Sequence, residues 1–242
     1  MVYNGAMGNN KAEIYKLDEM KELHRSTHKG KSKASFYKSV RKMVDSGAII
    51  RIERGRYSSS PRKQAFEAYC DYDDSRRLKS FLTARYGGDF EFIIYETTLL
   101  NQFLNHLLAK AMIVVEVPRA YAEDVFWGIK DSGQFESVLL CPTSDELYRY
   151  GEAMTIVVRP YVSKAPINLQ EHATTLEKLL VDIVCDPFLN SLYEGAEVPA
   201  MVNGIVNDYA LRYRAVSSYA KRRSAYEDLL AYLDEDKKEL FR

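Results

Sequence analysis

Positively charged side chains recur at helical spacing in one short segment near the start of the chain. In the stretch SFYKSVRKMVDSGAIIRIERGRYS, Lys38 is followed three and four residues later by Arg41 and Lys42, so a helix would place all three on one face. Further along, Arg54 and Arg56 flank a glycine in a predicted tight turn. Lysine and arginine side chains in such an arrangement bind phosphate oxygens, which predicts contact with a polyanion.

The charge of the chain is divided unevenly between its two parts. The 242 residues include 34 Lys or Arg and 34 Asp or Glu, so the formal net charge is zero. Residues 1–65 hold 15 of the basic and six of the acidic residues, a net charge of +9, and the rest of the chain therefore carries −9. This asymmetry indicates a basic module for a polyanion, attached to a body that is not basic.

The order of predicted helices and strands in residues 1–62 indicates a winged helix-turn-helix domain. These elements would position the basic side chains. We expect a short helix, a second helix, a polar loop and a third helix, and Asp18 can cap a helix whose apolar residues are Met20 and Leu23. The third helix should begin at Ser32 or Ser35 and end near Ser46, where a glycine follows.

A hairpin is predicted after the third helix. Residues 48–52 and 57–59 read as strands, and the turn between them carries Arg54 and Arg56. This hairpin would be the wing of the domain, and its arginines would reach phosphates or the minor groove of DNA.

The third helix has two different faces when successive residues are placed 100° apart. The apolar face comprises Phe36, Tyr37, Val40, Met43 and Val44. The opposite face comprises Ala34, Ser35, Lys38, Arg41, Lys42 and Asp45. A helix with small residues at its start and a basic face fits the major groove of duplex DNA. The predicted DNA-binding residues are Ser32, Lys33, Ser35, Lys38, Arg41, Lys42, Arg54 and Arg56.

Residues 63–242 predict an α/β domain with a mainly four- to five-stranded sheet and a helical C-terminal part. The predicted strands are residues 90–95, 112–117, 137–141 and 154–161, and they alternate with helices at 74–86, 97–109, 121–130 and 144–150. Helices at 174–185, 199–207, 215–221 and 225–234 complete the chain. Within the first of these, Lys178 and Asp182 form an i,i+4 pair opposite the leucines.

Motifs of common enzymes are missing from the sequence. It contains no G-x-x-x-x-G-K-[ST] loop, no G-x-G-x-x-G after a strand and no G-x-S-x-G elbow. Glu96 and Glu116, each at or near a predicted strand end, would be the pair that holds a divalent metal for phosphoryl chemistry. The alternative function is therefore a metal-dependent enzyme that processes nucleic acid or nucleotides, with a winged-helix targeting domain. Because no nuclease-type lysine follows Glu116, we expect no catalytic residues and no enzymatic activity.

The cysteines and histidines of the sequence give no indication of a cofactor or a metal site. Cys70, Cys141 and Cys185 lie far apart, and each is expected to be a small buried hydrophobe in a reduced cytoplasm. The four histidines show no metal-ligand spacing. The longest apolar runs are far shorter than the roughly 20 residues that cross a bilayer, and the start of the sequence shows no secretion signal. We expect a cytoplasmic protein with no membrane partner.

The order of several segments resembles the AbiEi-type antitoxins of bacterial abortive-infection systems. The winged segment quoted above is followed by FIIYETTLLNQFLNH, MIVVEVPRAYAEDVF, VVRPYVSKAPIN, TLEKLLVDIVCD and YAKRR, in the order of that family and over nearly the whole chain. The resemblance implies a transcriptional repressor that binds inverted repeats in its own promoter DNA, as a monomer or weak dimer that cooperates on DNA. It also implies an antitoxin that counters a nucleotidyltransferase-type toxin, without need of a stable complex.

The resemblance assigns roles to few residues. It gives the DNA contacts to Ser35, Lys38, Arg41 and Lys42 on the third helix and to Arg54 and Arg56 on the wing. Glu177 and Lys178 match the motif of the family, but their leucine-rich setting suits a structural helix as well. Two other functions stay open, namely the metal-dependent enzyme and a module whose winged domain binds another protein.

Overall fold

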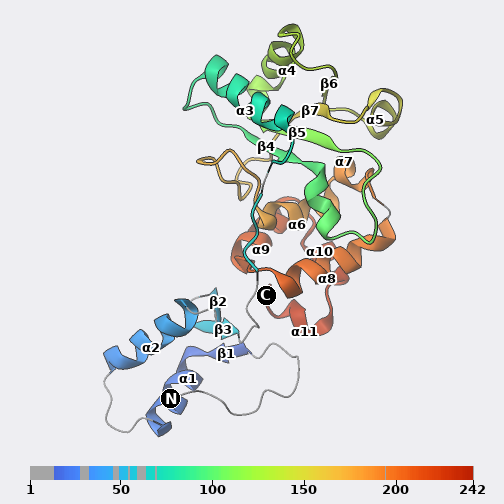
Figure 1. Ribbon diagram of the computed structural model, residues 1–242. Helices are drawn as coiled ribbons and strands as arrows, with labels where there is room; N and C mark the ends of the chain where they lie inside the picture. The colour runs from blue at the N-terminus through green and yellow to red at the C-terminus, as the bar shows by residue number, and fades with distance from the viewer. Residues whose placement is uncertain are drawn as a thin grey trace.

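The computed structural model describes residues 14–27, 33–45, 49–53, 55–58, 64–68, 70–193 and 195–241. Its N-terminal part contains β1 (Ile14–Lys16), α1 (Leu17–Thr27), α2 (Lys33–Asp45), β2 (Ile50–Glu53) and β3 (Arg56–Ser58). The three strands form an antiparallel sheet in the order β1-β3-β2, next to the two helices (Figure 1). The sequence predicted both of these helices and the hairpin. It also predicted a short helix before them, which is wrong for residues 14–16, because they pair with β3 as the strand β1.

A small hydrophobic cluster holds the N-terminal part together. Phe36 and Val40 of α2 are 6% and 5% exposed, and they pack with Ile49 and Tyr57. Apolar side chains of α1, such as Leu17, lie against the same cluster. One face of α2 is therefore buried, because the hydrophobic contacts of these side chains hold the helix against the rest of the N-terminal part.

The larger part of the chain is built on a four-stranded mixed sheet. Its strands lie side by side in the order β4 (Ile93–Glu96), β5 (Met112–Val117), β7 (Thr155–Pro160) and β6 (Val138–Leu140). β4 runs antiparallel to β5, whereas β5, β7 and β6 are parallel. Every residue of β4 and β5 is buried, because other elements cover both faces of the sheet.

The two faces of this sheet have different partners. One face packs on α3 (Asp73–Tyr86) and α4 (Ala122–Asp131). The other packs on the 3-10 helix η1 (Thr97–Gln102), on α5 (Ser144–Tyr150) and on α6 (Leu176–Cys185). The C-terminal helices lie on the α6 side (Figure 1), and they are α7 (Pro187–Asn190), α8 (Val198–Asp208), α9 (Tyr213–Arg222), α10 (Tyr226–Tyr232) and α11 (Glu235–Lys238). Two short 3-10 helices, η2 (Arg119–Tyr121) and η3 (Gly195–Glu197), lie between these elements.

The connections between the parallel strands pass over opposite faces of the sheet. α4 joins β5 to β6 on the α3 side, where Val125 and Ile129 are buried. α5 joins β6 to β7 on the α6 side, since Leu147 belongs to the core of that side. β7 is followed by the loop that leads to α6, so the helices that follow the neighbouring strands β5 and β7 lie on opposite faces of the sheet.

The structure confirms the mixed α/β class and gives the sheet four strands. The predicted helix over residues 97–109 is wrong, because only the 3-10 helix η1 forms there and irregular backbone follows it. Hydrogen bonds from the backbone to side chains of this segment explain why no regular helix forms. Thr97 Oγ1 accepts a hydrogen bond from the Met112 N–H at 3.0 Å, and Asn101 Oδ1 accepts one from the Leu108 N–H at 2.9 Å. Such side-chain bonds compete with the bonds of a regular helix.

Candidate nucleic-acid interface

The face of α2 that points away from its hydrophobic cluster is basic. Lys38, Arg41 and Lys42 are exposed, while Phe36 and Val40 on the other side are buried. This is the separation that the sequence periodicity predicted. A helix that presents three cations on one outer face has the geometry for contact with backbone phosphates.

Tyr37 lies on the exposed side of α2, where the sequence did not place it. Its side chain is 50% exposed, so its assignment to the apolar face is wrong. The ring lies 5.3 Å from the ring of Phe36 in an edge-to-face arrangement, which anchors it at the border of the cluster. Since Tyr37 precedes Arg41 by one helical turn, the outer face combines cations with an aromatic hydroxyl group.

Some of the predicted DNA-binding residues can be placed only in part. Ser35 is half-buried, and its carbonyl oxygen accepts a hydrogen bond from the Ser39 hydroxyl at 3.0 Å. Lys33 begins α2, but its side chain lies outside the described part of the chain. Ser32 and Arg54 lie outside the described residues altogether.

Arg56 of the hairpin contacts the C-terminal end of the chain. Its Nη2 atom lies 3.3 Å from Glu239 Oε2, and the two side chains are 23% and 54% exposed. The sequence predicts Arg56 at the tip of a wing, but it contains no signal for a contact with a carboxylate 183 residues away. A hydrogen-bonded arginine on the hairpin is available to phosphate only in competition with this carboxylate.

A row of six alternating charges lies inside the larger part of the protein. In order of contact it consists of Asp186, Arg159, Glu116, Lys178, Asp182 and Arg223, and we call it the charge chain. Both Nη atoms of Arg159 donate to Asp186, and its Nε lies 3.4 Å from Glu116 Oε1. Lys178 Nζ lies 2.9 Å from Glu116 and 2.7 Å from Asp182. Arg223 Nη1 lies 2.8 Å from Asp182 Oδ1.

The charge chain joins the sheet to the helices around α6. Glu116 and Arg159 are register partners on β5 and β7, whereas Lys178 and Asp182 belong to α6. Burial acts to lower the pKa of Lys178, but Asp182 and Glu116 outweigh it and raise this pKa well above its ordinary value. The sequence predicted the Lys178–Asp182 pair. It did not predict that this pair is 1% exposed or less.

Glu96 and Glu116 do not form the predicted metal-holding pair. Glu96 lies opposite Ile113, three residues along β5 from Glu116, so the two side chains project from opposite faces of the sheet. Glu96 instead accepts hydrogen bonds from the Tyr72 N–H at 2.9 Å and the Ser75 hydroxyl at 2.7 Å. Among the described residues, no group of three or more His, Cys, Asp or Glu side chains could hold a metal ion.

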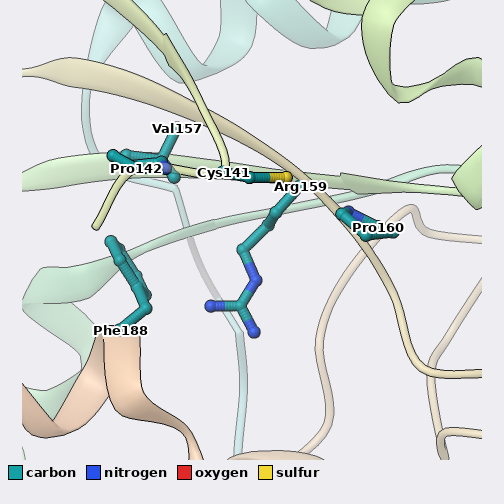
Figure 2. A pocket seen from close by; sticks show the side chains of 6 residues that line it. All are labelled: Cys141, Pro142, Val157, Arg159, Pro160 and Phe188. Atoms are coloured by element: carbon teal, nitrogen blue, oxygen red, sulfur yellow. The ribbon is translucent and has the colours of Figure 1, made fainter.

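A pocket of about 240 Å³ lies on the α6 side of the sheet, near the carboxyl ends of β6 and β7, and its lining side chains are shown in Figure 2. Its lining consists of Cys141, Pro142, Val157, Arg159, Pro160 and Phe188. Arg159 therefore belongs both to the pocket and to the charge chain. The Phe188 ring centre lies 5.2 Å from the Arg159 guanidinium carbon, within the range of a cation–π contact.

The cysteines are all free thiols, and their exposure differs from the prediction. Cys141 is exposed, so its expected burial is wrong, and Cys70 and Cys185 are half-buried. Burial raises the pKa of Cys70 and of Cys185 to about 11. Burial also raises the pKa of Cys141, against the opposing effect of Arg159 and Arg119.

Comparisons with known proteins give a family and no activity. A family model described as "Family of unknown function (DUF6577)" matches residues 35–239. The search of curated proteins returned no match. The RV2827C protein from Mycobacterium tuberculosis, known from a crystal structure, is similar over 91% of this chain and 75% of its own, with 15% identity and a TM-score of 0.30. No inference about function follows from so low a score. In the part of the chain that the structure describes, no helix is long and apolar enough to cross a membrane.

Proposed function

The chain belongs to the family of unknown function DUF6577, and we propose that it is a DNA-binding transcriptional repressor that also acts as the antitoxin of a toxin–antitoxin operon. The observation that carries the proposal is the outer face of α2. Lys38, Arg41 and Lys42 are exposed together there, in the part of the chain that holds an excess of nine positive charges.

The order of the N-terminal elements supports a winged helix-turn-helix assignment. α1 and α2 are followed by the β2–β3 hairpin, and the buried face of α2 packs on this sheet. In such domains the second helix of the pair enters the major groove and the hairpin contacts the flanking backbone. α2 would therefore read the groove with its outer face, and Arg56 would contact a phosphate next to it.

Tyr37 adds a further group to this proposed surface. Its exposed side chain lies beside Lys38 in the sequence and one turn before Arg41. A tyrosine hydroxyl can donate to a phosphate oxygen, as serine and threonine hydroxyls do. We therefore place Tyr37 with Lys38, Arg41 and Lys42 in the DNA-contacting set.

The antitoxin part of the proposal rests on the order of the body segments. The motif TLEKLLVDIVCD, which the resemblance to AbiEi-type antitoxins singled out, corresponds to α6 and the cap residues at its two ends. In this motif Lys178, Asp182 and Asp186 belong to the charge chain. Glu177 binds Arg212, with Glu177 Oε1 2.9 Å from Arg212 Nε. These contacts give the motif residues an architectural role, so an antitoxin surface would be built from their exposed neighbours.

The test of DNA binding uses the full chain and a labelled duplex of the sequence upstream of its own gene. Fluorescence anisotropy should show saturable binding that weakens steeply with salt. If about six phosphates are contacted, affinity should fall roughly a thousandfold between 50 and 200 mM salt. The double variant Lys38→Ala/Arg41→Ala should bind at least tenfold more weakly.

A matched control removes the same charge from the body. Lys130 at the end of α4 and Arg149 on α5 are exposed and lie in the sheet part of the chain. The variant Lys130→Ala/Arg149→Ala should bind the duplex as the wild type does. Equal binding by both double variants would contradict the placement of the interface on α2. Co-expression with the nucleotidyltransferase of the same operon tests the antitoxin role, which predicts that the full chain restores growth.

A further inference from the structure

The pocket beside Arg159 lies at the end of the sheet where ligand sites of α/β proteins are usually found. In open sheets, ligands bind near the carboxyl ends of parallel strands. The pocket lies at the carboxyl ends of β6 and β7, and the helices that follow these two strands, α5 and α6, both lie on the α6 side of the sheet. Arg159 lies near the carboxyl end of β7, and Cys141 directly follows β6.

Backbone hydrogen bonds hold both walls of the pocket. The Cys141 N–H donates to the Val158 oxygen at 2.9 Å, and its φ of 44° turns the chain sharply at the end of β6. Pro142 follows this turn and precedes the Thr143 capping box of α5. On the opposite wall, the Phe188 N–H donates to Asp186 Oδ1 at 3.0 Å. Rigid walls reduce the entropy lost when a ligand binds.

Arg159 brings unused hydrogen-bond donors to this pocket. A guanidinium group has five N–H donors. Within the described part of the chain, Arg159 contacts Asp186 through one N–H of each Nη and approaches Glu116 through Nε, which accounts for three donors. The two remaining N–H groups lie on opposite edges of the planar guanidinium group, and the Arg159 side chain is 14% exposed. A carbonyl oxygen beside one of these edges would find one donor already oriented.

The charges within the charge chain are balanced. The charge chain holds three cations, Arg159, Lys178 and Arg223, and three carboxylates, so its net charge is zero. An anionic ligand would add an uncompensated negative charge near Glu116 and Asp186, which is unfavourable at low dielectric. A neutral acceptor group avoids this cost while it satisfies the free donors.

The remaining lining favours a flat apolar ring. Two proline rings and one phenyl ring line the pocket, at Pro142, Pro160 and Phe188, and the Arg159 guanidinium lies between these walls (Figure 2). The volume of about 240 Å³ is that of about eight water molecules in the liquid. It is below the range of about 300–1,000 Å³ that holds drug-sized ligands, so a single ring fits better than a large ligand.

We infer that this pocket binds a neutral six-membered heteroaromatic ring with a ring carbonyl, such as the base of a pyrimidine nucleoside. The carbonyl oxygen accepts a hydrogen bond from Arg159, the ring lies against the prolines and Phe188, and the sugar points to solvent. This site is independent of the proposed DNA interface on α2.

Cys141 provides a built-in reporter for the test. The full chain is treated with iodoacetamide, and alkylation of the peptides that contain Cys141, Cys70 and Cys185 is followed by mass spectrometry, with and without uridine. At a uridine concentration of about four times Kd, alkylation of Cys141 should slow about fivefold, while the other two cysteines are unaffected. Benzoate, an anionic ring of similar size, should give little protection. Saturation-transfer NMR with uridine should show contact with the ring protons.

Two variants test the role of the lining. Arg159→Lys keeps the positive charge of the charge chain but removes the planar donors, and uridine protection should be lost. Pro142→Phe fills the mouth of the pocket without a change in the charge chain, and it should abolish the saturation-transfer signal. Circular dichroism checks that both variants are folded. No protection and no saturation transfer in the wild type at about 10 mM uridine would overturn the inference, and so would stronger protection by benzoate than by uridine.

Discussion

Arg56 Nη2 lies 3.3 Å from Glu239 Oε2, so a cation of the β2–β3 hairpin is bound by a carboxylate near the C-terminal end of the described chain. β2 also packs near α9 in the same region. The hairpin that we propose to contact DNA is therefore joined to the larger part of the protein through opposite charges. A phosphate oxygen and the Glu239 carboxylate offer the same kind of acceptor to Arg56, and they would compete for it.

Removal of this competing carboxylate should strengthen DNA binding. We expect Glu239→Gln to raise the affinity for operator DNA about two- to fivefold, because an exposed ion pair contributes at most about 1 kcal/mol. Asp236→Asn on α11 removes the same charge and is the matched control. An equal change in both variants, measured by anisotropy at one salt concentration, would show that the Arg56 contact has no role.

The salt dependence of binding should report the contribution of Lys42. Each phosphate contact contributes about 0.9 to the slope of log K against log salt concentration. Lys42→Ala should therefore make the slope shallower by about 0.9, while the preference among DNA sequences stays the same. A titration from 50 to 300 mM salt measures this, and an unchanged slope would exclude a phosphate contact at Lys42.

Interruption of the charge chain should destabilise the fold. Lys178→Met leaves Glu116 and Asp182 buried without their shared cation, and we expect a loss of about 3–5 kcal/mol in the free energy of unfolding. Lys221→Met is the control, because Lys221 is exposed on α9 and should change stability by about 0.5 kcal/mol or less. Urea denaturation followed by circular dichroism compares them. Similar losses in the two variants would contradict the architectural role of the chain.

Stability should fall in acid partly through Asp186. Burial raises the pKa of Asp186, but the hydrogen bond and charge of Arg159 hold it below its ordinary value in the folded protein. Its contribution to stability is therefore present above about pH 4, the unfolded value, and is lost as the pH falls through the lower folded value. Asp186→Asn should show a weaker dependence of unfolding free energy on pH between about 5 and 2 than the wild type.

The three thiols should react at different rates. Burial raises the pKa of Cys70 and Cys185 to about 11, so at pH 8 about one molecule in a thousand carries the reactive thiolate at either site. Cys141 is exposed and should be alkylated first. Mass spectrometry of iodoacetamide-treated protein gives the order, and labelling of Cys70 as fast as Cys141 would contradict it.

Periodicity predicted the features of the fold that are local in sequence. The Met112–Val117 strand has the predicted bounds, and α2 separates its cations from Phe36 and Val40 as expected. Tyr37 was misplaced because it lies at the border between the two faces, where an angle of 100° per residue does not decide between packing and exposure.

The contacts that build the charge chain could not be predicted, because they depend on strand order. An i,i+4 pair such as Lys178 and Asp182 usually lies on a solvated helix surface. Only the parallel register that places Glu116 beside Arg159, and α6 on that face of the sheet, buries the pair. The Arg56–Glu239 contact has the same origin, since no local pattern relates residues so far apart.

The charge chain also limits how this protein can exchange segments with its relatives. Its sheet half, Glu116 and Arg159, and its helical half, from Lys178 to Arg223, lie on either side of the loop between β7 and α6. A recombinant joined within that loop would inherit one half from each parent, and a mismatch at any of the six positions would leave a buried ion without its counter-ion. The sheet and the C-terminal helices are therefore expected to be inherited together.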